Sequence, residues 1–259
     1  MLYYNQKLLK QANFSEQNRA FLFGDAVFET CLIKNYQIIN FTAHLNRLQQ
    51  ASAFLAMPCQ IATIIKQSNE LIKINQQQNG ILRIQIGRNQ GSNGYLPSAD
   101  CDFFTIIQTL SNRPSPTDIS LIVSNRNITG NFRFKTSNSL PYVLAKIDAQ
   151  QQQATDSIIV DNGIVCETGS ANIFWRIGDK LYTPSDNCKL IFGTVRKIIC
   201  NKFAVDMVEW HIDQLKTADE VFITNSIILA KSVNNIRFSD GSIVNYQHKI
   251  IKDILKFLG

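Results

Sequence analysis

Residues 167–174 read ETGSANIF, residues 181–183 read LYT and residues 191–196 read IFGTVR. A glutamate and, five residues later, an asparagine begin this part of the chain, and Gly193 precedes the expected start of a helix. Residues 173–177 and 181–183 flank a Gly-Asp pair and predict a hairpin. These three separated segments predict a fold only when they are taken together as one pattern.

The chain on either side of this pattern mixes helices with strands. Hairpin signals and alternation of apolar residues predict strands, and apolar residues on one face predict helices. No strict βαβ repeat is present, so we predict an α+β fold. The predicted elements are a hairpin of residues 157–160 and 164–166, strands at residues 81–86 and 102–110, and helices at residues 43–55 and 247–258.

Residues 111–118, SNRPSPTD, predict a linker, because two prolines among polar residues prevent a helix and interrupt strand pairing. The linker separates a smaller N-terminal α/β domain, residues 1–110, from a larger C-terminal domain, residues 119–259. Both are plausible sizes for a domain.

Composition excludes several classes of protein. The chain has 259 residues, of which 45% are hydrophobic and 18% are charged, so it can form a full core. The net charge of +6 is scattered along the chain, and we expect no nucleic-acid partner. No apolar run approaches the roughly 20 residues that span a bilayer, so we expect no membrane partner. The N-terminus lacks the features of a signal peptide, which predicts a cytoplasmic protein.

Short catalytic motifs are missing as well. The three histidines, His44, His211 and His248, lie far apart, and the six cysteines show no zinc-like spacing, so we expect no metal and free thiols. Motifs of the GxSxG, GxxxxGK[ST] and GxGxxG kinds do not occur. This argues against an α/β-hydrolase, a nucleotide hydrolase and a Rossmann dehydrogenase.

The opening pattern resembles the signature of the class-IV aminotransferases, with one departure: Thr194 stands where that family prefers an aliphatic residue. The resemblance implies the two-domain D-amino-acid-aminotransferase-like fold, which is pyridoxal-phosphate fold type IV. It also implies pyridoxal 5'-phosphate as cofactor, a small amino substrate and a homodimer. Further similar segments are residues 23–30 (FGDAVFET), 43–48 (AHLNRL), 135–140 (KTSNSL) and 218–226 (ADEVFITNS).

A pyridoxal cofactor needs an amine to hold it, an acid at its ring nitrogen and donors for its phosphate. The resemblance places the amine at Lys135, in the larger domain, where Phe132 and Phe134 would favour the neutral amine by excluding water. It places the acid at Glu167. It places the phosphate donors at Arg47, Ser226 and the backbone amides of Thr194 and Val195. Arg196 is left unassigned.

Three subfamilies compete for the substrate: 4-amino-4-deoxychorismate lyases, branched-chain aminotransferases and D-amino-acid aminotransferases. The short chain, residues 79–88 (NGILRIQIGR) before Gly94-Tyr95, and residues 224–226 (TNS) are similar to the lyases. Ser139 stands where branched-chain enzymes carry a tyrosine. The Arg-x-His carboxylate trap of the D-amino-acid enzymes reads here as residues 93–95, Asn-Gly-Tyr.

The lyase interpretation predicts conversion of 4-amino-4-deoxychorismate to 4-aminobenzoate and pyruvate, a step toward folate precursors. Thr30, Asn93 and Tyr95 are its candidate substrate residues. Asn93 departs from the lyases, which carry arginine there, and a lost charged donor can remove a hydrogen bond worth about 1.5–3 kcal/mol. The alternatives are an aminotransferase of branched-chain or D-amino acids and, without catalysis, a basic protein that binds an acidic partner.

Overall fold

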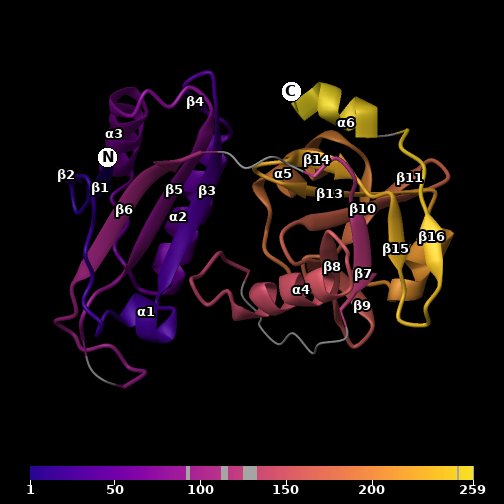
Figure 1. Ribbon diagram of the computed structural model, residues 1–259, viewed down its shortest axis with the longest axis horizontal. Coiled ribbons are helices and arrows are strands. Elements are labelled where there is room, and N and C mark those ends of the chain that lie inside the picture. Colours follow the sequence, from indigo (N-terminus) through magenta and orange to yellow (C-terminus); the bar gives the residue numbers. More distant parts are fainter. Residues whose placement is uncertain (92–93, 112–115, 125–132, 250, 259) are drawn as a thin grey trace. The chain divides into compact units, whose positions relative to one another are not determined.

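The computed structural model describes residues 1–91, 94–111, 116–124, 133–249 and 251–258 (Figure 1). The chain forms two compact units. The first unit contains Met1–Arg113 and Phe134–Ser139, and the second contains Pro114–Arg133 and Leu140–Gly259. Residues 112–115 of the predicted linker lie outside the described part of the chain.

This division differs from the predicted domains in the segment that carries Lys135. The segment lies in the first unit and not in the larger C-terminal one. Backbone pairing explains why: Thr136 forms an antiparallel bridge with Val27, and the Phe28 amide donates to the Lys135 carbonyl at 2.9 Å. Tertiary hydrogen bonds, which no local sequence pattern reveals, therefore assign this segment to the first unit.

The first unit is built on an antiparallel six-stranded sheet with the order β2-β1-β6-β5-β3-β4. The strand predicted at residues 81–86 is confirmed, and its residues alternate between buried and half-buried as expected. The strand predicted at residues 102–110 is also confirmed. The strands are β1 (Leu2–Tyr4), β2 (Lys7–Leu9), β3 (Ala26–Lys34), β4 (Gln37–Ile38), β5 (Gly80–Arg88) and β6 (Phe103–Leu110).

Two helices, α2 (Phe41–Phe54) and α3 (Ile61–Ile74), pack against this sheet, and the short α1 (Arg19–Phe23) lies near β5. The helix predicted at residues 43–55 is confirmed within a residue or two at each end. Its buried Leu45 and Leu48 join the core formed with β3, β5 and β6. The core therefore lies between the sheet and the two long helices.

The second unit contains two five-stranded sheets, with the orders β12-β11-β10-β13-β14 and β16-β15-β7-β8-β9. Both predicted hairpins are confirmed as antiparallel pairs, β8 with β9 and β10 with β11. The first sheet contains β10 (Asn172–Ile177), β11 (Lys180–Pro184), β12 (Val205–Val208), β13 (Glu220–Asn225) and β14 (Leu229–Ser232). The second contains β7 (Ser120–Val123), β8 (Asp156–Asp161), β9 (Ile164–Thr168), β15 (Asn235–Arg237) and β16 (Ile243–Asn245).

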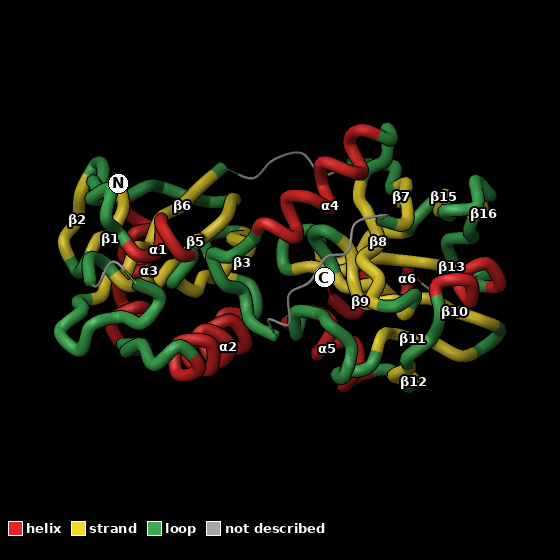
Figure 2. Tube along the Cα trace, turned by 90° about the horizontal axis from the view of Figure 1, so that it is seen from below, coloured by secondary structure: helices red, strands yellow, loops and turns green. Residues whose placement is uncertain are grey.

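The two sheets of this unit share one core, which combines residues such as Leu121 and Ile158 with Ile173 and Ile223. Helices α5 (Thr194–Lys202) and α6 (Ile251–Leu258) pack on the other face of the first sheet. Helix α4 (Leu140–Gln151) packs on the second sheet instead, and Figure 2 shows it across the strands from α5. A 3-10 helix, Ile212–Thr217, completes the unit.

The final helix is shorter than predicted. The sequence pattern predicts a helix over residues 247–258, but α6 begins at Ile251, and residues 247–249 are not helical. The Gln247 amide donates to the Asp219 carbonyl and the Lys249 amide to the Glu220 carboxylate, so tertiary bonds hold this segment outside the helix. None of the helices in the described ranges is long and apolar enough to cross a membrane. All six cysteines are free thiols, as predicted.

Candidate active site

Lys135 stands over an aromatic ring of the first unit. Its Nζ lies 4.7 Å from the centroid of Phe28, a residue of β3. The backbone on either side is fixed to the same strand, because the Ser137 amide donates to the Ala26 carbonyl at 2.8 Å. Phe134 packs against the core of the first unit, while Phe132 lies outside the described residues, so their effect on the Lys135 amine stays a prediction.

A second cation shares this ring. The guanidinium carbon of Arg83, in β5, lies 4.8 Å from the Phe28 centroid. The register of β3 with β5 places Thr30 directly opposite Arg83, so the two side chains lie on one face of the sheet. The Nε of Arg83 is buried and has no hydrogen-bond partner among the described residues, and burial lowers the pKa of this guanidinium. Such an arginine is suited to a carboxylate ligand.

Sequence reasoning missed Arg83. An arginine between Leu82 and Ile84 in an alternating strand predicts a solvated face, because polar residues usually occupy the outer side of such a strand. The only local signal is its place inside residues 79–88, the segment that resembles the lyases. Its closeness to the ring beneath Lys135 depends on pairing between distant strands.

The opposite face of β3 carries a buried carboxylate. Glu29 is 1% exposed and accepts from Arg47 Nε at 2.7 Å and from Arg47 Nη2 at 2.7 Å. Nδ1 of His44 lies 2.6 Å from the same carboxylate. Burial alone raises the pKa of Glu29, but the charge and hydrogen bonds of Arg47, helped by His44, outweigh it and hold the pKa at about 2.

Arg47 is the side chain predicted to bind the cofactor phosphate. Its guanidinium is held in a fixed orientation by Glu29 through two hydrogen bonds. The phosphate role stays a prediction, and Glu29 emerges as the residue that orients Arg47. Sequence reasoning missed this role of Glu29, whose only signal is its place in residues 23–30.

In the second unit, Glu167 is 3% exposed and receives hydrogen bonds on both oxygens. The Tyr142 hydroxyl donates to Oε1 at 2.7 Å, while Asn172 Nδ2 and the Ile191 amide donate to Oε2 at 3.3 and 3.1 Å. Donors of this kind stabilise the ionised carboxylate. Glu167 is thus held in one orientation by neutral groups from three different segments.

Asn172 explains part of the signature. Its Nδ2 also donates to the Ile191 carbonyl at 2.9 Å, which fixes the segment that enters α5. A Cβ at Gly193 would overlap Asn172 Oδ1, closer than atoms can approach. The asparagine and the glycine are therefore required together, by packing as well as by chemistry.

The amino end of α5 has the properties of an anion site. Its N-cap is Gly193, so the capping residue offers no side-chain acceptor to the first amides, those of Thr194 and Val195. The first-turn residue Arg196 instead binds Asp186 and the Pro184 carbonyl, a structural role for a residue that sequence analysis leaves unassigned.

Ser226 follows β13 in a turn that the structure fixes through Asn225. The Asn225 side chain accepts from the amides of Ile227 and Ile228 and donates to the Ser170 carbonyl at 3.1 Å. This turn therefore lies against the loop that follows Glu167. The hydroxyl of Thr224, at the end of the strand, is buried and has no partner among the described residues.

The predicted substrate residues are less well defined. Asn93 lies outside the described residues. Tyr95 is 90% exposed, and the loop that carries it is held by Arg19, whose guanidinium donates to the carbonyls of Gly94 and Tyr95 at 2.7 Å each. Thr30 shares a sheet face with Arg83. The first unit thus contains Lys135, Arg47, Thr30 and Tyr95; the second contains Glu167, Thr194, Val195 and Ser226.

Comparison with known proteins identifies the family. The model of the family "Amino-transferase class IV" matches residues 26–236. The chain belongs to the class IV aminotransferase family. It is 26% identical over 246 residues to an aminodeoxychorismate lyase of Bacillus subtilis (strain 168), covering 88% of this chain and 84% of that protein. It is also 26% identical over 238 residues to a D-alanine aminotransferase of Bacillus licheniformis, covering 86% and 83%.

The fold is shared with solved members. A branched-chain amino acid aminotransferase from Escherichia coli has a TM-score of 0.89 at 20% identity, covering 98% of this chain and 91% of that one. The predicted family and fold type IV are therefore confirmed, and the protein is a pyridoxal-phosphate-dependent class IV enzyme, either a lyase or an aminotransferase. The chain is equally identical to a lyase and to an aminotransferase, so sequence identity does not distinguish between the two reactions.

The residues present fit this cofactor. A buried carboxylate that accepts hydrogen bonds on both oxygens is suited to a protonated ring nitrogen. The first amides of α5 and the hydroxyl of Thr224, which has no partner in the described ranges, are groups suited to a phosphate. A lysine packed over an aromatic ring is suited to be the amine.

The Glu29 carboxylate predicts a pH-dependent stability. Because its pKa is lowered from 4.5 to about 2, ionised Glu29 stabilises the fold fully above about pH 4.5, and this stabilisation is lost as the pH falls toward 2. We expect Glu29→Gln to lower the free energy of unfolding by about 3 kcal/mol at pH 7. The difference from wild type, measured by urea unfolding between pH 7 and 3, should shrink below pH 4.5.

Glu70→Gln is the matched control, since this carboxylate of the same unit accepts from the Tyr3 hydroxyl at 3.0 Å outside the Glu29 cluster. It should change stability far less. A Glu29→Gln effect that stays constant across this pH range would contradict the assigned role of the carboxylate charge.

Proposed function

We propose that this protein is a pyridoxal-phosphate-dependent lyase that converts 4-amino-4-deoxychorismate to 4-aminobenzoate and pyruvate, in the synthesis of folate precursors. The observation that supports the lyase choice most is Arg83. The lyase-like segment, residues 79–88, carries this guanidinium to the ring over which Lys135 stands, and leaves its Nε unpartnered among the described residues. The substrate has carboxylates that such a group can bind.

Arg83 also offers the charged donor that Asn93 lacks. The lyases carry an arginine at that position, and its loss would remove a donor to a substrate carboxylate. A guanidinium with a buried Nε, supplied from β5, offers a charged donor from another part of the same unit. We therefore assign substrate carboxylate binding to Arg83, with Thr30 on the same face of the sheet as its neighbour.

In this proposal the predicted site residues bind the cofactor, and they contact different parts of it. Lys135 holds pyridoxal phosphate through its amine, Glu167 faces the ring nitrogen, and Arg47, Ser226 and the amides of Thr194 and Val195 contact the phosphate. When bound, the cofactor supplies an electron sink for the carbon that carries the substrate nitrogen. Glu29 keeps the Arg47 guanidinium in place for this task.

Lys135 then moves the protons. With the cofactor and substrate bound, its Nζ would be the base that accepts the proton from the substrate ring carbon that bears nitrogen. The carbon–oxygen bond to the enolpyruvyl group breaks, this group takes up a proton and leaves as pyruvate, and the ring becomes aromatic. Phe28 lies beside the amine, with its ring centroid 4.7 Å from Nζ.

The second candidate is an aminotransferase of branched-chain or D-amino acids, favoured by the identity to the D-alanine aminotransferase. It would use the same lysine but leave the nitrogen on the cofactor. A homodimer is part of the proposal and is tested by light scattering of the purified protein. The cytoplasmic location stays a prediction.

Lys135 is expected to be the residue that holds the cofactor. Borohydride treatment of the holoenzyme, followed by peptide mapping, should fix pyridoxal phosphate on Lys135. Lys135→Ala should bind cofactor but retain none after reduction and denaturation. Lys146→Ala, which removes a lysine bound to the Thr155 carbonyl, should be labelled as wild type is. Covalent label in the Lys135→Ala protein would place the cofactor lysine elsewhere.

Arg47 is expected to bind the phosphate. Arg47→Ala should weaken binding of pyridoxal phosphate about tenfold or more relative to pyridoxal, which has no phosphate, because a charged donor to the phosphate is worth at least about 1.5 kcal/mol. The ratio of the two dissociation constants cancels any general loosening of the site. Arg196→Ala, whose arginine binds Asp186, should leave the ratio unchanged. Equal loss for both ligands in Arg47→Ala would make Arg47 structural only.

Lyase activity is tested with 4-amino-4-deoxychorismate and no oxo-acid acceptor. We expect equal amounts of 4-aminobenzoate and pyruvate, with recovery of the starting cofactor absorbance. Arg83→Ala should raise KM about tenfold or more, since a charged hydrogen bond is worth about 1.5–3 kcal/mol, while Arg237→Ala, in the other unit, should not. Bleaching by an ordinary amino acid, with no 4-aminobenzoate formed, would establish the aminotransferase instead.

A further inference from the structure

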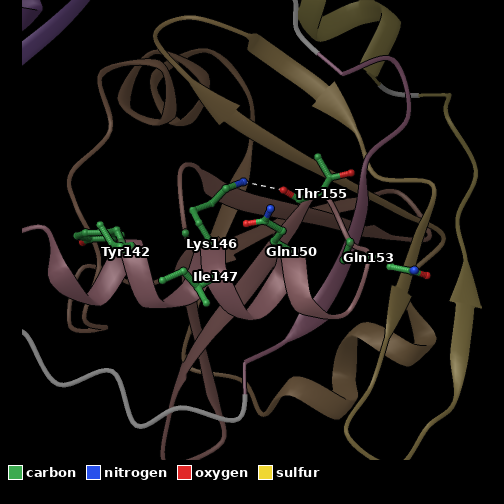
Figure 3. A pocket seen from close by; sticks show the side chains of 9 residues that line it. Tyr142, Lys146, Ile147, Gln150, Gln153 and Thr155 are labelled. Carbon is green, nitrogen blue, oxygen red and sulfur yellow. Dashed lines mark hydrogen bonds between the residues drawn. The ribbon is translucent and has the colours of Figure 1, made fainter.

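Tyr142 is the donor to Glu167 that comes from a helix. It lies in the first turn of α4, directly after Pro141, a residue that helices tolerate only there. Its hydroxyl donates to Glu167 Oε1 at 2.7 Å. Figure 3 shows Tyr142 at one end of the α4 side chains, apart from Lys146, whose Nζ donates to the Thr155 carbonyl. The contact lies wholly within the second unit.

The rest of the Tyr142 side chain is fixed by packing. The ring packs against the cluster that contains Ala145 of its own helix together with Ile159 and Cys166. Cys166, a member of this cluster, is the neighbour of Glu167 in β9. The hydroxyl therefore cannot swing away without unpacking the ring.

The bond has a definite chemical direction. Burial, together with the charge of Glu167, raises the pKa of Tyr142 far above its ordinary value, so the phenol stays protonated and acts as the donor. A donor to the charged form stabilises a carboxylate and makes it a weaker base. Asn172 and the Ile191 amide act on Oε2, so Tyr142 alone among these three donors acts on Oε1.

We propose that Tyr142 is a positioning residue for the cofactor: its hydroxyl holds Glu167 as an oriented, weakly basic carboxylate, so that the shared proton stays on the cofactor ring nitrogen. This inference rests on the proposed role of Glu167 at that nitrogen. It does not depend on the choice between lyase and aminotransferase. A ring nitrogen that keeps its proton is the better electron sink in either reaction.

The test reads the ring nitrogen directly, by nuclear magnetic resonance of the holoenzyme loaded with ¹⁵N-labelled pyridoxal phosphate. The chemical shift of this nucleus separates the protonated from the unprotonated ring. Wild type should show the protonated position. Tyr142→Phe, which keeps the ring and removes only the hydroxyl, should move the resonance part of the way toward the position seen in Glu167→Gln.

Tyr246→Phe is the matched control. It removes another buried phenolic hydroxyl of the same unit, one that donates to the Leu215 carbonyl at 2.9 Å. Its ¹⁵N resonance should equal that of wild type, and thermal unfolding of each protein is recorded alongside. If Glu167→Gln moves the resonance and Tyr142→Phe does not, the inference is overturned while the proposed role of Glu167 stands. If Glu167→Gln does not move it, both are overturned.

A second measurement keeps the hydroxyl and so does not depend on the Phe variant folding. With 3-fluorotyrosine at position 142, the ¹⁹F resonance should shift when pyridoxal phosphate binds, because the ring nitrogen and the phenol share Glu167. It should shift much less with 1-deazapyridoxal phosphate, which has carbon in place of that nitrogen. Equal shifts with both ligands would overturn the inference.

Discussion

The contact between Asn172 and Gly193 is the constraint on which much of the second unit depends. The amide of Asn172 fills the space that a Cβ at position 193 would need, and it donates to both Glu167 and the Ile191 carbonyl. One buried side chain therefore joins the end of β9, the start of β10 and the entry into α5. Loss of any partner would leave a buried polar group unsatisfied, which costs about 1–3 kcal/mol.

The two units each bury a carboxylate, but they stabilise it in different ways. Glu29 is paired with the cation Arg47, so its charge is neutralised where it stands and serves to orient the guanidinium. The three donors to Glu167 described above are neutral: a phenol, an amide side chain and a backbone amide. Each of these three donors stabilises the carboxylate without adding a positive charge of its own, which suits a residue whose proposed task is to meet a cationic ring.

Local structure could be predicted well, because short sequence patterns indicate hairpins and amphipathic helices. Asn162 and Gly163 both have positive φ, as the two-residue turn between Asp161 and Ile164 of the predicted hairpin requires. What the sequence could not reveal depends on contacts between distant segments. The membership of Lys135 in the first unit, the start of α6 at Ile251 and the nearness of Arg83 to Phe28 all follow from tertiary bonds or strand register.

Strand register also explains why residues 26–31 form one uninterrupted stretch of β3. Alternation along β3 sends Val27, Glu29 and Cys31 to the helix side of the sheet and leaves Phe28 and Thr30 on the other. Glu29 therefore contacts Arg47 on one face of the sheet, and Phe28 contacts Lys135 and Arg83 on the opposite face. A slip of one residue between β3 and β5 would exchange the faces and bury the wrong side chains. The two chemistries of the first unit, orientation of Arg47 and support of Lys135, are thus fixed by a single register.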